Sequence, residues 1–220
     1  MRIRIFTFPN RLYAITDRHL GHLPHDEIVA QLLVGGARTI QIRDKESSPR
    51  ELLEIARACL KLTRAVGARL LINDFLDVAL AAGADGVHLG QDDLSVEEAR
   101  AIMGPDKIIG LSTHTLDQFR SGLATSADYL AVGPIFATST KENPSATVGL
   151  ELLRQVQPVT DRPIVAIGGI SLHRARRVID AGADAVAVIS ALYPIPDMST
   201  PAESSEISAR VRLLLDALGD

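Results

Sequence analysis

Short apolar runs recur along the chain, each followed by polar residues. They lie at 11–17, 35–45, 69–74, 82–93, 108–113, 126–136, 163–169 and 181–192. Four of them share one phrase, in which small residues and a polar residue precede a β-branched run, as in "AGADAVAVISAL". Gly suits the C-terminal end of a helix, and a short run rich in Val and Ile suits a strand buried on both faces. The pattern therefore predicts eight strands, four of them entered directly from a helix.

Helical patterns fill the gaps between these runs. Ser48 with Glu51 and Ser95 with Glu98 have the Ser-x-x-Glu spacing of a capping box, and Pro49 occupies the favoured first helical position. Residues at helical spacing then form one inward stripe that ends at Gly67: Leu52, Ile55, Ala56, Cys59, Thr63 and Val66. The cysteine is thus predicted to pack against the strands and not to act as a nucleophile.

Eight strands alternating with about eight helices in 220 residues predict an α/β protein, a single-domain (β/α)8 TIM barrel over residues 1–220. An open doubly wound sheet uses the same alternation. No Gly-x-Gly-x-x-Gly fingerprint opens a first helix, which weakens the dinucleotide-binding version of that sheet. We therefore favour the barrel, in which chemistry sits at the C-terminal ends of the strands.

Composition narrows the class of protein. Apolar residues make up 46% of the chain and charged residues 23%, and the formal net charge is -4. This charge argues against a general nucleic-acid binder, because such proteins carry a basic excess. The N-terminal segment lacks the apolar core of a signal peptide, and no segment approaches membrane-spanning length. We expect a cytoplasmic protein with no nucleic-acid or membrane partner; its oligomeric state stays open.

Nearly every predicted strand ends in hydrogen-bonding or charged groups. In chain order these are Asp17; Gln41, Arg43 and Lys45; Asn73 and Asp74; His88, Gln91, Asp92 and Asp93; Ser112, Thr113 and His114; Thr138, Ser139, Thr140 and Lys141; Gly168 and Gly169; and Ser190. A solvated loop would explain one such end, but it does not explain eight in register.

The segment "QIRDK" at 41–45 places two cations on one side of an otherwise apolar strand. Residues two apart on a strand share a face, so Gln41, Arg43 and Lys45 point together. A surface edge strand would be one explanation. If they face the barrel mouth instead, burying two cations is costly unless an anion pairs with them. The expected ligand is then anionic, and phosphate suits both side chains.

Asp74 and Asp93 follow adjacent predicted strands, whose axes lie about 5 Å apart. Two carboxylates that close repel unless a cation or a proton lies between them. Magnesium is the natural choice, since one or two carboxylates and substrate phosphate oxygens commonly hold it. Acids favoured at helix starts by the helix dipole explain the pair equally well.

A second anion site is predicted after the seventh and eighth strands, where barrels frequently bind phosphate through backbone N–H groups. Gly169 and Ser190 lie there. The segment "TSTK" at 138–141 fits a flap between the two anion sites, and it equally fits an ordinary polar loop. His19, His22 and His25 lie in a Gly- and Pro-containing segment typical of a solvated loop, and we assign them no role.

Taken together, "YAITD", "QIRDK", "IND", "GVHLGQDDL", "IGLSTH", "GPIFATSTK", "AIGGI" and "AVAVISAL" resemble the thiamine phosphate synthase family in order and spacing, from about residue 11 to residue 193. The resemblance implies a (β/α)8 barrel that joins 4-amino-2-methyl-5-hydroxymethylpyrimidine diphosphate to a thiazole phosphate, carboxylated or not. Thiamine phosphate and pyrophosphate are the products. It further implies that magnesium-bound pyrophosphate leaves first and that the thiazole nitrogen captures the resulting cation.

The resemblance also implies roles for particular residues. It assigns the pyrimidine diphosphate to Gln41, Arg43, Lys45, Asn73, Ser112 and Lys141, magnesium to Asp74 and Asp93, and the thiazole phosphate to Thr138, Thr140, Gly169, Ile189 and Ser190. The predicted substrate-binding set also includes Asp44 and Ser139, and the predicted catalytic residues are Arg43, Lys45, Ser112 and Lys141.

One position departs from the family pattern: Phe75 stands where the family usually has arginine after "IND", so any anion contact from that position is lost. Two other functions remain as alternatives. A sibling family of thiazole tautomerases shares the barrel but tends to lose the cationic and magnesium-binding residues. A barrel that binds phosphorylated ligands without turnover is the other alternative.

Overall fold

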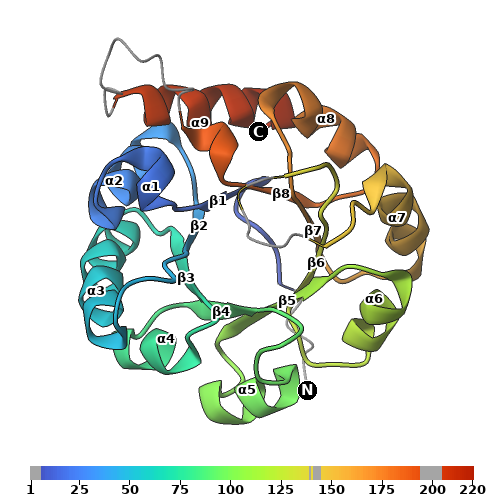
Figure 1. Cartoon of the computed structure of the whole chain (residues 1–220), viewed down its shortest axis with the longest axis horizontal. Helices are drawn as coiled ribbons and strands as arrows, with labels where there is room; N and C mark the ends of the chain where they lie inside the picture. Colours follow the sequence, from blue (N-terminus) through green and yellow to red (C-terminus); the bar gives the residue numbers. More distant parts are fainter. Residues whose placement is uncertain (1–5, 139, 141–144, 194–204) are drawn as a thin grey trace.

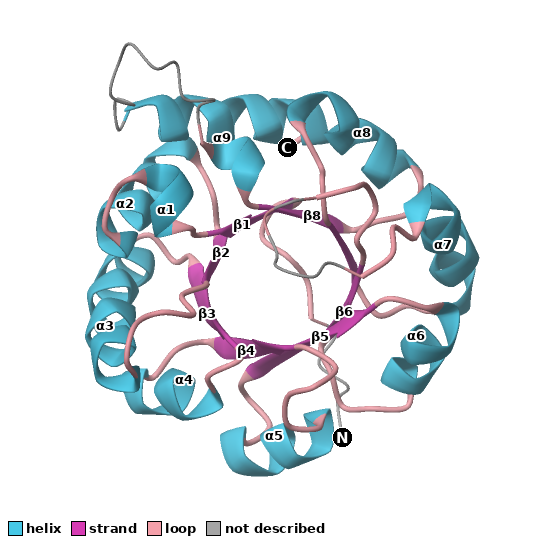
Figure 2. Ribbon diagram, in the orientation of Figure 1, coloured by secondary structure: helices cyan, strands magenta, loops and turns pink. Residues whose placement is uncertain are grey.

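Eight parallel strands form a closed barrel in the order β1 to β8, surrounded by helices (Figure 1, Figure 2). The computed structural model describes residues 6–138, 140, 145–193 and 205–220. The strands are β1 (Leu12–Ile15), β2 (Thr39–Ile42), β3 (Arg69–Asn73), β4 (Gly86–Leu89), β5 (Ile108–Thr113), β6 (Tyr129–Val132), β7 (Ile164–Ile167) and β8 (Ala185–Val188). Each predicted run contains one of them. Because β1 pairs with β8, the barrel prediction is confirmed and the open sheet is excluded.

The helices form an outer ring around the strands (Figure 1). They are α1 (Arg18–Gly21), α2 (His25–Gly35), α3 (Pro49–Ala65), α4 (Leu76–Ala82), α5 (Val96–Met103), α6 (Leu116–Leu123), α7 (Gly149–Val156), α8 (Leu172–Asp180) and α9 (Ser205–Leu218), with short 3-10 turns η1 (Gln157–Val159) and η2 (Ser190–Leu192). The last helix, α9, lies beside both α2 and α8 and so closes the ring. Within the described ranges, no helix has the length and apolar character needed to cross a membrane.

Helix α3 follows its sequence pattern closely. Ser48 and Glu51 form the predicted capping box, and a second box opens α5 at Ser95 and Glu98. Along the stripe Cys59 is fully buried, and this burial raises the pKa of its thiol to about 12. The stripe ends earlier than predicted: the helix stops at residue 65, and Val66 is exposed.

Two apolar layers hold the barrel. The larger lies between the strands and the outer helices, where Leu12, Ile40 and Phe119 are fully buried. The smaller lies inside the barrel around the rings of Tyr13 and Tyr129. Phe6 and Phe8 pack against these rings from the N-terminal segment, with the Phe8 ring centroid 5.4 Å from that of Tyr129. Side chains thus fill the floor of the barrel beneath the C-terminal ends of the strands.

Candidate active site

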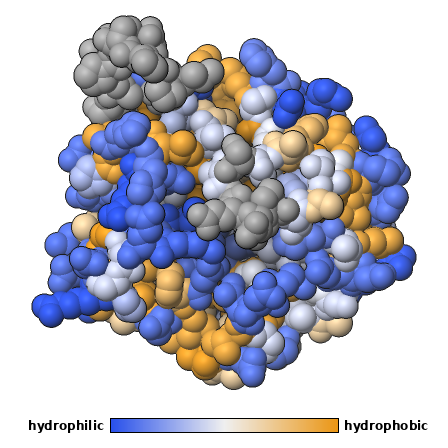
Figure 3. All heavy atoms as spheres, viewed as in Figure 1, coloured by the Kyte–Doolittle hydropathy of each residue, from blue (hydrophilic) through white to orange (hydrophobic). Residues whose placement is uncertain are grey.

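A cavity of about 170 Å³ opens at the C-terminal ends of the strands. Most of the predicted site residues line it: Gln41, Arg43, Lys45, Asn73, Asp74, Ser112, Thr138, Thr140, Gly169, Ile189 and Ser190. A wider hollow adjoins it beside η2 and α9 and shares Arg43, Lys45 and Ser190 with it. Ser139 and Lys141 lie outside the described residues. Hydrophilic residues gather beside the barrel mouth on the side where α1, α2 and α3 lie (Figure 3).

The two cations of "QIRDK" lie at the cavity wall. Strand β2 pairs with β1 on one side and β3 on the other, so the edge-strand explanation is excluded. Arg43 Nη1 is 4.0 Å from an Asp17 carboxylate oxygen, and Lys45 Nζ is 3.5 Å from one of Asp74. The Arg43 side chain is 21% exposed and that of Lys45 is 53% exposed. Both are accessible to an anionic ligand in the cavity.

Asp74 lines the cavity, whereas Asp93 is exposed, lies outside the cavity lining and accepts a hydrogen bond from the Gly90 backbone N–H, but the two carboxylates are close enough to interact. Burial, and then the charge of Asp93, raise the pKa of Asp74 above its usual range. The Asp74 backbone has a φ of +62°, in the left-handed region that non-Gly residues rarely occupy. Neither carboxylate caps a helix: the residue before α4 is Phe75, which caps nothing, and Ser95 caps α5. Capping therefore does not explain the pair, although both acids shortly precede helix starts, where the helix dipole favours a negative charge. A cation between the two carboxylates would relieve their repulsion.

The loop after β7 is built for close approach of a ligand to the backbone. Gly168 has a φ of +99° and Gly169 a φ of +60°. A Cβ added to Gly169 would lie 2.3 Å from the Ala137 carbonyl oxygen, so only glycine fits there. Ser190 begins the 3-10 turn η2 just after the neighbouring strand β8. Exposed backbone N–H groups in such loops suit an anion.

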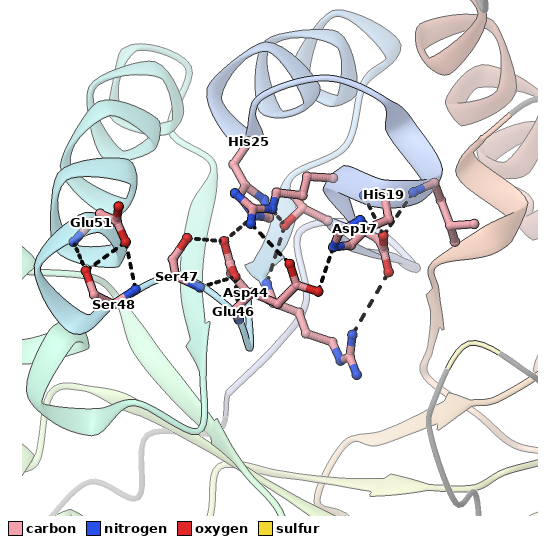
Figure 4. Close-up of polar contacts among 12 residues, drawn as sticks. Asp17, His19, His25, Asp44, Glu46, Ser47, Ser48 and Glu51 are labelled. Atoms are coloured by element: carbon pink, nitrogen blue, oxygen red, sulfur yellow. Dashed lines mark hydrogen bonds and ion pairs between the residues drawn. The ribbon is translucent and has the colours of Figure 1, made fainter.

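Asp44 lies apart from the cavity, which corrects its place in the predicted substrate-binding set. Its carboxylate accepts hydrogen bonds from the backbone N–H groups of Glu46 and Ser47 and from the Ser47 hydroxyl (Figure 4). Burial alone would raise its pKa, but these hydrogen bonds outweigh burial and lower the pKa to about 2. Asp44 therefore holds the loop that follows Arg43 and Lys45.

His25 is the partner of Asp44 from α2 (Figure 4). Its Nε2 lies 3.2 Å from an Asp44 carboxylate oxygen, and its Nδ1 lies 2.8 Å from the Thr16 hydroxyl. The side chain is 1% exposed, so the prediction of a solvated loop residue is wrong for His25. His22 is exposed as expected, and His19 is an exposed ion-pair partner of Glu46.

We expect the free energy of unfolding to decrease as the pH falls below about 6.5, the usual pKa of an unfolded histidine. Burial lowers the pKa of His25 in the folded protein, so the unfolded chain binds this proton more readily. Urea unfolding at about pH 8 and about pH 5.5 measures the decrease. It should be smaller in His25→Asn and unchanged in the exposed control His22→Asn. An equal decrease in His25→Asn and the parent would contradict the assignment.

The other residues that line the cavity include Tyr13, His88 and His114. The strand-end pattern marks the two histidines as polar without giving them a role. Tyr13 lies inside β1, four residues before Asp17, and the two-residue period places both on the same face. The two-residue period could therefore have identified Tyr13 as a cavity residue.

Phe75, which stands where the family usually has arginine, packs against the core and does not line the cavity.

The comparisons with known proteins agree with this geometry. The family model described as thiamine monophosphate synthase matches residues 12–192. The chain belongs to the thiamine monophosphate synthase family. It is 46% identical over 199 residues to the thiamine-phosphate synthase of Moorella thermoacetica, covering 90% of this chain and 95% of that one. It is 48% identical over 193 residues to that of Koribacter versatilis, covering 84% and 90%.

A solved structure supports the same assignment. The thiamine phosphate pyrophosphorylase from Pyrococcus furiosus superposes with a TM-score of 0.82 at 38% identity, covering 95% of each chain. Membership of the thiamine monophosphate synthase family makes this chain a transferase of thiamine biosynthesis that acts on small pyrimidine and thiazole substrates.

Proposed function

We propose that the chain joins 4-amino-2-methyl-5-hydroxymethylpyrimidine diphosphate to 4-methyl-5-(2-hydroxyethyl)thiazole phosphate, giving thiamine phosphate and pyrophosphate. A carboxylated thiazole phosphate would give the same product with release of CO2. One observation carries the proposal: a single cavity has Arg43 and Lys45 on one wall and the Gly168–Gly169 loop with Ser190 on the other. Two anion-binding walls match two substrates that each carry phosphate.

The bond that breaks joins the pyrimidine methylene carbon to the diphosphate oxygen, and its electron pair leaves on pyrophosphate. Arg43 and Lys45 bind the diphosphate and stabilise the charge that develops on it. The lone pair of the thiazole nitrogen then forms the new C–N bond. Such a dissociative substitution depends on leaving-group stabilisation and positioning, so no nucleophilic side chain is required.

Magnesium would be held by Asp74 and Asp93 together with diphosphate oxygens. Their donor chemistry fits, because two hard carboxylate oxygens leave most of an octahedral shell to water and phosphate. Among the described residues, no group of three or more His, Cys, Asp or Glu side chains forms a separate metal cluster. When bound, the ion would neutralise charge on the departing pyrophosphate.

Incubation of the protein with both substrates and magnesium tests the proposal through release of pyrophosphate. Release that requires both substrates supports the synthase reaction. Isomerisation of the thiazole phosphate alone would indicate a tautomerase, and a ligand-induced rise in melting temperature without turnover would indicate a binding protein.

Ser190→Ala should raise the KM for thiazole phosphate roughly tenfold or more, because a hydrogen bond to a charged group is lost. A smaller decrease in kcat is compatible with contacts that also serve the transition state. Ser190 is the better probe of this wall, since alanine at Gly169 would clash with the Ala137 backbone. The exposed Ser121→Ala on α6 serves as control. An unchanged thiazole KM in Ser190→Ala would place the phosphate elsewhere.

A further inference from the structure

A continuous chain of hydrogen bonds crosses the barrel interior beneath the cavity. Gln41 Nε2 donates to the Tyr13 hydroxyl at 2.8 Å, and the hydroxyls of Tyr13 and Tyr129 are 2.9 Å apart. The Tyr129 hydroxyl lies 2.8 Å from His88 Nδ1, and His88 Nε2 lies 2.8 Å from Ser112 Oγ. Gln41 on β2 and Ser112 on β5, which both line the cavity, are thus connected through three residues inside the barrel.

The middle of this chain is shielded from water. Tyr13 and Tyr129 are at most 1% exposed, and Phe6 and Phe8 pack against their rings from below. Burial raises the pKa of both tyrosines, so each hydroxyl keeps its proton. Each phenol can therefore donate one hydrogen bond and accept others.

Because each hydroxyl has a single hydrogen, the first link sets the direction of the rest. Tyr13 accepts from the Gln41 amide and therefore donates to Tyr129. Tyr129 then donates to Nδ1 of His88, and the remaining ring proton, on Nε2, is donated to the Ser112 oxygen. The hydrogen of the Ser112 hydroxyl remains for the cavity, as does the amide oxygen of Gln41.

We propose that Tyr13, Tyr129 and His88 are positioning residues that fix the direction of these hydrogen bonds, so that Gln41 presents an acceptor and Ser112 a donor to the pyrimidine ring. An exocyclic amine beside a ring nitrogen offers the complementary pattern, one donor and one acceptor. The inference rests on the proposed function and deepens it by naming what selects an aminopyrimidine.

The same hydrogen-bonded chain disfavours the deaminated analogue. A pyrimidine with a carbonyl oxygen in place of the amine offers an acceptor and a ring N–H donor, which is the opposite pattern. To bind that analogue, the Gln41 amide would have to turn over and every proton of the chain would have to move with it. Removing the hydroxyl of Tyr13 or Tyr129 would uncouple the orientation of the Gln41 amide from that of the Ser112 hydroxyl. The preference for the amine over its carbonyl analogue would then decrease.

The test compares the KM for the amine-bearing diphosphate with the inhibition constant of its carbonyl analogue. The discrimination is the inhibition constant of the analogue divided by the KM of the amine-bearing diphosphate. In Tyr129→Phe, and likewise in Tyr13→Phe, we expect this ratio to fall roughly tenfold or more. Tyr193→Phe is the matched control, since its buried hydroxyl accepts from the Asp17 backbone N–H and, among the described residues, takes no part in this hydrogen-bonded chain. Its ratio should stay that of the parent. An unchanged ratio in a Tyr129→Phe protein with a native melting curve would overturn the proposal.

A second measurement separates this proposal from the proposed function. Nitrogen-15 NMR of the ligand-free protein, with His88 assigned by its loss in His88→Asn, reports which ring nitrogen carries the proton. We expect a protonated Nε2 and a bare Nδ1 in the parent, and a mixture of tautomers in Tyr129→Phe. A proton on Nδ1 in the parent would overturn the proposed direction whatever the activity. If His88 has the expected tautomer but the protein releases no pyrophosphate, the proposed function is wrong. The pyrimidine is then not the group that the hydrogen-bonded residues select.

Discussion

Asp74→Asn and Asp93→Asn should keep the parent's melting temperature and lose about 10²-fold or more of the activity. Asn preserves the shape of each side chain and removes one charge. It also tolerates the left-handed backbone at position 74, where φ is +62°. Burial, and then the charge of Asp93, raise the pKa of Asp74, so its ionised form is unfavourable there and the loss of one charge should not destabilise the fold.

The measurement is pyrophosphate release against magnesium concentration. The parent should respond at low magnesium once the diphosphate is present, and both variants should need more of the ion for whatever activity remains. The neighbouring exposed acids supply controls: Asp77→Asn on α4 and Asp92→Asn on the β4–α5 loop should follow the parent's curve. A parent that works equally well in excess chelator would show that the acidic pair binds no metal used in the reaction.

The fold could be predicted because each strand and its polar end repeat in one order. A closed parallel barrel brings all the C-terminal strand ends to one rim, so the sequence predicts that residues as distant as Gln41 and Ser190 line one cavity. Both line it. Local sequence motifs predict helix starts as well, since both predicted capping boxes form, at α3 and at α5.

Other parts of the site depend on packing that the sequence pattern does not encode. The two-residue period puts Asp44 on the face opposite to Arg43 and Lys45, which already argues against a place for Asp44 in the substrate-binding set. The sequence predicts a loop residue at His25, because nothing in its local spacing reveals that α2 packs beside the loop after β2. Its burial and its contact with Asp44 come from tertiary structure alone.

The hydrogen-bonded chain beneath the cavity depends on tertiary structure even more than the contact between His25 and Asp44 does. Its members come from β1, β2, β4, β5 and β6. The strand-end pattern marks Gln41, His88 and Ser112, but in its own segment neither Tyr13 nor Tyr129 differs from an ordinary strand residue. Only the closure of the barrel places the hydroxyls of Tyr13 and Tyr129 within 2.9 Å of each other. Sequence periodicity gives the face on which a residue lies but not the residue that meets it across the barrel.

Arg43→Ala and Lys45→Ala should each lower kcat by about 10²- to 10³-fold while the protein stays folded. Among the described residues neither cation is held by a close ion pair: Arg43 is 4.0 Å from an Asp17 carboxylate oxygen, Lys45 is 3.5 Å from one of Asp74, and the Lys45 side chain is half exposed. Ion pairs of this kind contribute at most about 1 kcal/mol to stability. Their charge is instead available to the diphosphate, whose developing negative charge needs it most in the transition state.

Two matched variants separate the role in the site from the loss of a charge. Arg38→Ala removes a guanidinium just before β2, where Arg38 donates to the Ala37 carbonyl far from the cavity mouth. Lys61→Ala removes an exposed ammonium from α3. Both should retain the parent's kcat. Arg43→Lys should recover only part of the lost activity, because lysine keeps the charge but cannot grip phosphate with two parallel hydrogen bonds. If Arg43→Ala and Lys45→Ala unfold while the controls do not, the two cations are structural partners of Asp17 and Asp74, and their assignment to the diphosphate is wrong.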